Sequence, residues 1–90
     1  MDKKVIAKAL NARKIKPGQI KLICIEDSNT KGVYEVWCSL RNWRIVGYMT
    51  PFKKLFTTND KEQALEYAQI VQDIDRKNPI IKDLTRGEAP

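Results

Sequence analysis

The 90-residue sequence contains no histidine, only two cysteines and four isolated glycines. Without histidine, proton transfer near neutral pH would depend on a carboxylate or a lysine. No C-x-x-C pair is present, so the ligands of a common zinc site are missing. The glycines match no phosphate-loop, dinucleotide-binding or nucleophile-elbow motif. We therefore expect a protein that is not an enzyme and that uses no metal and no cofactor.

Long apolar runs are also absent. None approaches the roughly 18 residues that a membrane-spanning helix needs, so we expect no membrane partner. The N-terminal MDKKVIAKALNARK has a charged start but no apolar segment of signal-peptide length. These features predict a cytoplasmic protein. Cys24 and Cys38 lie in apolar, strand-like stretches, so they are either buried, reduced thiols or a disulfide between neighbouring strands.

Positive charge is concentrated in the first part of the chain. Seventeen Lys and Arg against eleven Asp and Glu give a net charge of +6. Residues 1–56 contain twelve basic and four acidic residues, a net +8, whereas residues 57–90 contain five and seven, a net −2. This asymmetry favours a polyanionic partner, although it is also common on soluble surfaces.

The pattern of apolar residues predicts two helices with strands between them. Residues 2–11 place their apolar side chains on one helical face. A second helix is capped by Thr58 or Asn59 and ends at Asn78-Pro79. Its predicted apolar stripe consists of Ala64, Leu65, Ala68, Val71 and Ile74, with Tyr67 beside it. The predicted strands are Ile20–Asp27, Val33–Ser39, Trp43–Met49 and Phe52–Thr58.

This order predicts a two-layer α+β sandwich, with an antiparallel sheet of three or four strands and a helix at each end (α-β-β-β-β-α). Residues 1–79 would form the single domain, and residues 80–90 a C-terminal tail. If an even-length loop joins the second and third strands, Tyr34, Val36 and Cys38 face the core and Trp37 faces away. An odd-length loop would change this assignment.

The stretch EVWCSLRNWRIVGYMTPFKK, residues 35–54, combines aromatic and basic side chains. Trp37 and Arg44 would lie nearly opposite each other on adjacent strands. Such a face can stack bases and neutralise phosphates. Alternatively, Trp37 packs internally and Arg44 covers it in a cation–π pair. The candidate nucleic-acid-binding residues on this face are Trp37, Arg41, Arg44, Tyr48, Lys53 and Lys54.

A second basic cluster lies near the N-terminus. Its candidate binding residues are Lys3, Lys4, Arg13, Lys14 and Lys16, with Lys8 and Lys21 nearby. These cations could contact a polyanion backbone, and each neutralised phosphate of duplex DNA would add about 0.9 to the salt slope. The alternative is a solubilising surface on a small helix.

The order of helix, strands and helix resembles the double-stranded RNA-binding domain. That family contacts the RNA backbone through a lysine-rich start to its last helix, whereas this helix begins TNDKEQAL, with Asp60, Glu62 and only Lys61. The binding residues of that family therefore do not carry over.

The stretch YEVWCSLRNWRIVGYMTPFKKLFTTNDKEQALEYA resembles the three-stranded sheet and helix of arm-type DNA-binding domains in phage and transposon integrases. Phe56, Thr58, Glu62 and Ala64 fall on the helix-entry pattern of that family. The resemblance covers about 35 residues, and the strand Ile20–Asp27 lies outside it. It implies DNA binding through the sheet.

The leading hypothesis is a small, basic, non-enzymatic nucleic-acid-binding or regulatory protein, of the kind that a phage or mobile element encodes, with DNA or RNA as its partner. The alternative is a protein-interaction module, an inhibitor or adaptor, that uses the exposed aromatics or a sheet edge and could form a homodimer. A third reading, metal-dependent catalysis by Glu62 and Glu66, competes with that of a solvated helix face.

Overall fold

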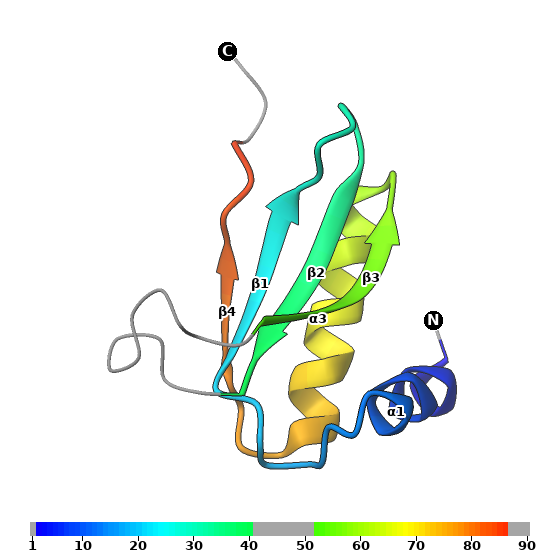
Figure 1. Cartoon of the computed structure of the whole chain (residues 1–90), viewed down its shortest axis with the longest axis vertical. Helices are drawn as coiled ribbons and strands as arrows, with labels where there is room; N and C mark the ends of the chain where they lie inside the picture. Colours follow the sequence, from blue (N-terminus) through cyan, green and yellow to red (C-terminus); the bar gives the residue numbers. More distant parts are fainter. Residues whose placement is uncertain (1, 41–51, 87–90) are drawn as a thin grey trace.

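The computed structural model describes residues 2–40 and 52–86. Within these residues it is a small α+β fold with two helices and a four-stranded sheet. In Figure 1, α3 lies behind the sheet and α1 lies to the lower right, where it packs against α3. The elements in chain order are α1 (Lys3–Ala12), β1 (Leu22–Asp27), β2 (Tyr34–Ser39), β3 (Phe52–Thr58), α3 (Lys61–Asp75) and β4 (Ile80–Asp83).

The sheet is mixed, which corrects the predicted antiparallel sheet and the order α-β-β-β-β-α. Its strand order is β3-β2-β1-β4, and β4 runs parallel to β1. The direction of β4 follows from the chain path: α3 returns antiparallel to β3, so β4 runs the same way as β3 and therefore as β1. The segment predicted as a tail thus supplies a strand. The predicted strand Trp43–Met49, with Arg44 and Tyr48, lies outside the described residues, as does Arg41.

Each helix begins at an aspartate. The carboxylate of Asp2 accepts a hydrogen bond from the amide of Lys4, and that of Asp60 accepts one from the amide of Glu62. Such caps satisfy amides that have no partner within the helix. The predicted caps at Thr58 or Asn59 were wrong, because Thr58 lies at the end of β3 and its hydroxyl accepts a hydrogen bond from the amide of Asp60.

The core lies between α3 and the sheet. The predicted strand Ile20–Asp27 corresponds to β1, which lies inside the sheet: all four residues from Leu22 to Ile25 are buried and β1 has a neighbour on each side. The helix stripe differs at two positions: Tyr67 is buried at 4% exposure, whereas Leu65 is 43% exposed. Helical spacing explains this exchange, because residue 67 lies on the same face as Ala64 and Val71, three and four positions away.

A β-bulge interrupts the pairing of β2 and β3. Val36 pairs with Phe56 and Trp37 pairs with Lys54, which leaves Leu55 without a direct partner. Leu55 and Phe56 consequently both contribute to the core side of the sheet, where Phe56 stacks on Tyr67 at a centroid distance of 4.3 Å. The bulge therefore breaks the simple alternation of a regular strand, which would place Leu55 and Phe56 on opposite sides of the sheet.

Candidate functional site

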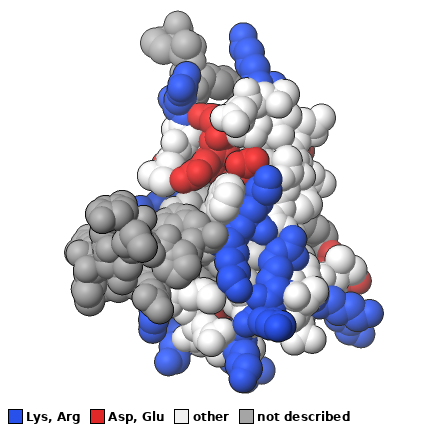
Figure 2. All heavy atoms as spheres, viewed as in Figure 1, with Lys and Arg blue, Asp and Glu red and all other residues white. Residues whose placement is uncertain are grey.

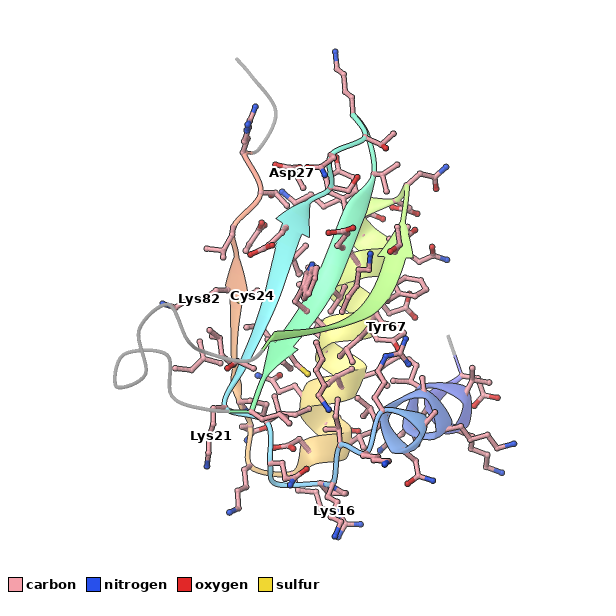
Figure 3. All side chains as sticks on the ribbon, viewed as in Figure 1. Lys16, Lys21, Cys24, Asp27, Tyr67 and Lys82 are labelled. Atoms are coloured by element: carbon pink, nitrogen blue, oxygen red, sulfur yellow. The ribbon has the colours of Figure 1, made fainter. Side chains whose placement is uncertain are left out.

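The sheet face opposite α3, here called the open face, carries Trp37. Val36 and Cys38 are buried in the core, so alternation places Trp37 between them on the opposite face, as predicted for an even-length loop. The strand registers align four residues in one row across the open face: Lys54, Trp37, Cys24 and Lys82. Figure 3 shows Cys24 and Lys82 on their neighbouring strands. Trp37 is half-buried in this row.

The carboxylate of Glu35 contacts both polar groups beside the Trp37 ring, the indole N–H and the Lys54 ammonium. The indole Nε1–H donates to Glu35 Oε1 at 3.1 Å, and Lys54 Nζ lies 3.4 Å from Glu35 Oε2. The same Nζ lies 5.8 Å from the centroid of the Trp37 ring. The described cation over Trp37 is therefore Lys54, which comes from β3. Both donors of this group are already paired within the protein. Arg44, which the sequence analysis placed opposite Trp37, lies outside the described residues.

The open face also carries a pair of carboxylates. Glu26 on β1 lies directly opposite Glu35 on β2 in the antiparallel register. Figure 2 shows acidic side chains gathered in the upper part of this face, with basic side chains below them. Like charges opposite each other disfavour the pairing of strands, and they repel a polyanion. The open face is therefore of mixed charge and not uniformly basic.

Two of the predicted binding cations make internal contacts. Lys53 pairs with Cys38 on the core side of the sheet, away from Trp37, and its Nζ donates to the backbone oxygen of Arg13 at 3.0 Å. Arg13 in turn donates to the backbone oxygens of Lys54 and Ala9, each at 3.0 Å. These contacts fasten the end of α1 to β3. Lys53 and Lys54, predicted to act together, thus lie on different faces.

The remaining predicted lysines divide by position. Lys3 forms an ion pair with Asp73 at 2.7 Å, in which both side chains are exposed. Lys4 is exposed on α1 and forms no ion pair with another described residue. Lys14 and Lys16 follow α1, where the chain turns towards β1, and both are exposed.

A cluster of exposed cations, here called the basic end, lies where α1 leads into β1 and α3 leads into β4. Figure 3 shows Lys16 and Lys21 at this lower end of the molecule, and Figure 2 shows basic side chains there. Lys77 joins them, since its Cε lies 3.4 Å from the position that a Cβ on Gly18 would occupy. The basic end consists of Lys14, Lys16, Lys21, Arg76 and Lys77.

The two segments that supply the basic end, residues 13–21 and 76–79, contain no Asp or Glu. Within the described part of the chain, none of its five cations forms an ion pair. Sequence reasoning missed Arg76 and Lys77, which are distant in sequence from residues 14–21. Their place just after a helix was the available signal, because cations are favoured at the C-terminal end of the helix dipole.

Asp75 holds the two segments of the basic end together. Its Oδ1 accepts hydrogen bonds from the amides of Gly18, at 2.7 Å, and Ile20, at 3.3 Å. Gly18 has φ +86°, a conformation that glycine adopts without a steric penalty. Asp75 is only 2% exposed. The turn at residues 16–20 is thus fixed against the end of α3 by a buried carboxylate.

The two cysteines are free and buried. The register pairs Cys38 with Ile23 and Cys24 with Trp37, so the two thiols project from opposite faces of the sheet. This arrangement excludes the alternative of a disulfide between them. Burial raises the pKa of each thiol from 9.0 to about 11.

Within residues 2–40 and 52–86, no three His, Cys, Asp or Glu side chains lie together as a metal site would require. Glu62 and Glu66 are exposed on α3. None of the described helices has the length and apolar character needed to cross a membrane. Comparison with protein-family models, with curated proteins and with solved structures found no match to this chain.

Proposed function

We propose that this protein binds nucleic acid through the basic end, without catalysing a reaction. The observation that carries the proposal is the gathering of five exposed cations from two distant segments, none of which forms an ion pair with another described residue. The carboxylate that joins these segments, Asp75, is buried. Phosphate oxygens are the natural partners of such a cluster, and release of their counterions supplies affinity. Contacts of this kind position a nucleic acid and carry little sequence information.

The open face would form one border of this interface. Lys54 lies on the open face and remains 49% exposed despite its contact with Glu35. Trp37 beside it could contact a base or a sugar, since aromatic rings stack on bases with little regard to sequence. Glu26 and Glu35 would repel phosphates and so end the footprint. The bound strand would therefore approach from the basic end and stop short of the carboxylate pair.

Fluorescence anisotropy with a labelled mixed-sequence DNA duplex and a single-stranded RNA of equal length tests the proposal. If all five cations contact duplex phosphates, a plot of log K against log salt concentration falls with a slope of about −4.5, from about 0.9 per phosphate. Single-stranded RNA would give a smaller slope, because each phosphate contributes about 0.7. Failure of both probes to bind at low salt would overturn the proposal.

A matched pair of double variants locates the interface. Lys16→Glu with Lys77→Glu reverses two charges of the basic end. Lys31→Glu with Arg86→Glu makes the same charge change at the opposite end, where both side chains are exposed and line one hollow. We expect the first variant to lose at least tenfold in affinity, about 1.4 kcal/mol, and the second much less. Equal losses would show a response to net charge and not a site.

A protein-binding function is the second candidate, and the edge strand β4 favours it. Ile80 is 62% exposed and Leu84, just beyond the strand, is 53% exposed. Strand edges with apolar side chains can pair with a partner strand or with a second copy. Sedimentation equilibrium at high salt distinguishes the candidates, since this association would survive salt and be reduced by Ile80→Asp. A monomer at all concentrations would remove self-association from consideration.

A further inference from the structure

A small pocket lies behind the basic end, between the last turn of α1, the segment leading to β1, and the last turn of α3. Its volume is about 130 Å³. Apolar side chains form most of its lining, among them Leu10, Ile15, Ile20 and Ile74. Asp75 is the acidic residue of this lining, and Lys16 contributes to it from an exposed position.

Asp75 is placed where a carboxylate is disfavoured. It is almost fully buried, and it is the last residue of α3, where the helix dipole is negative. Two backbone amides satisfy Oδ1, but Oδ2 has no hydrogen-bond partner among the described residues. A buried polar atom without a partner costs about 1–3 kcal/mol. Fixing the turn needs only Oδ1, so Oδ2 is left buried and without a donor.

We propose that this pocket binds a small primary amine, with its ammonium group paired to Asp75 and its aliphatic body against the apolar lining. The proposal does not depend on nucleic-acid binding. An ammonium group supplies the donor that Oδ2 lacks, and a charge-assisted hydrogen bond is roughly twice as strong as a neutral one. The apolar lining excludes water from the rest of the ligand, which favours a hydrocarbon chain over a polar one.

The volume sets the size of the ligand. An apolar cavity of about 150 Å³ holds one benzene molecule. A pocket of 130 Å³ therefore accepts about five non-hydrogen atoms, the number in n-butylamine. The ammonium of Lys16 opposes the entry of a second cation, so removal of this charge should tighten binding. The effect of the Lys16 charge on affinity therefore distinguishes an amine that reaches Asp75 from one that binds elsewhere.

The test is a titration of the full chain with n-butylammonium chloride, followed by the amide NMR resonances of Gly18 and Ile20. Both amides donate to Asp75, so they report directly on that carboxylate. We expect saturable shifts, with at least tenfold weaker binding of 1-butanol, which has the same shape without the charge. Equal amounts of sodium chloride control for ionic strength. Equal affinities for amine and alcohol, or no saturable shift, would overturn the proposal.

Substitutions inside and outside the pocket test where the amine binds. Ala7 lines the pocket, and Ala12 on the same helix is exposed and lies outside it. Ala7→Leu should abolish butylamine binding by filling the space, whereas Ala12→Leu should leave it unchanged. Asp75→Asn should reduce amine binding to the level of the alcohol, and if this variant fails to fold, the alanine pair decides. Butylamine binding that persists in Ala7→Leu would place the ligand elsewhere and overturn the proposal.

Discussion

The open face and the basic end both contain clustered cations, but their charges are used differently. On the open face, Lys54 and the indole of Trp37 both contact Glu35. At the basic end, five cations form no ion pair with another described residue, and the carboxylate that joins the two segments, Asp75, is buried and accepts from backbone amides. The same types of residue thus give a neutralised surface in one place and a positive one in the other. The placement of a few acids decides between them.

The largest effect is expected when the basic end loses the buried carboxylate that supports it. We expect Asp75→Ala to lower the free energy of unfolding by about 2–3 kcal/mol, because two amides, one of them buried, lose a charged acceptor. Urea denaturation measures this loss. Asp73→Ala is the matched control, since Asp73 is exposed on the same helix. Equal stability of the two variants would show that the turn at residues 16–20 is held by packing alone.

The contrast between the two regions is measured directly by removing one lysine from each. Lys16→Ala should weaken binding to duplex DNA several-fold and reduce the salt slope by about 0.9, the contribution of one phosphate. Lys54→Ala should change both quantities less, because Glu35 already neutralises part of the Lys54 charge. Anisotropy titrations at several salt concentrations give both numbers. A larger effect of Lys54→Ala than of Lys16→Ala would show that nucleic acid binds to the open face.

A smaller effect, of opposite sign, is expected at Glu35. Glu35→Gln keeps an acceptor for the indole N–H but removes the charge that neutralises Lys54. We expect affinity for nucleic acid to rise about two- to threefold at low salt, and this gain to vanish as salt screens the interaction. Glu62→Gln, on the exposed surface of α3, controls for net charge. A decrease in affinity would mean that the Glu35 charge helps to position Trp37 for binding.

Local patterns predicted much of this fold, and long-range placement accounts for what they missed. Phe52–Thr58 forms a strand with the predicted bounds, and Tyr34, Val36 and Cys38 point to the core side as their alternation indicated. In contrast, β4 is only four residues long, too short for a periodicity to appear. Its place beside β1 depends on the path of α3, which no local pattern specifies.

The candidate site was harder to predict, for the same reason. Whether Lys53 and Lys54 share a face with Trp37 depends on the bulge at Leu55, and the sequence alternation gives no sign of it. The basic end joins Lys16 to Lys77 through the contact between Gly18 and Asp75, 57 positions apart. Composition showed an excess of positive charge, but only the fold shows which cations have partners.

The smallest expected effect at neutral pH concerns the two cysteines, one of which lies on each face of the sheet. Cys24 on the open face and Cys38 on the core face both have a pKa near 11, because both are buried. The folded protein therefore retains these protons at pH values where the unfolded chain, with thiol pKa values near 9, has lost them. Stability from this source is complete below pH 9 and is lost as the pH rises towards about 11. Urea denaturation across this range should show a shallower decline for Cys24→Ala and for Cys38→Ala than for the natural chain. An unchanged slope for Cys24→Ala alone would show that the open face admits water to its thiol and that only the core face is closed.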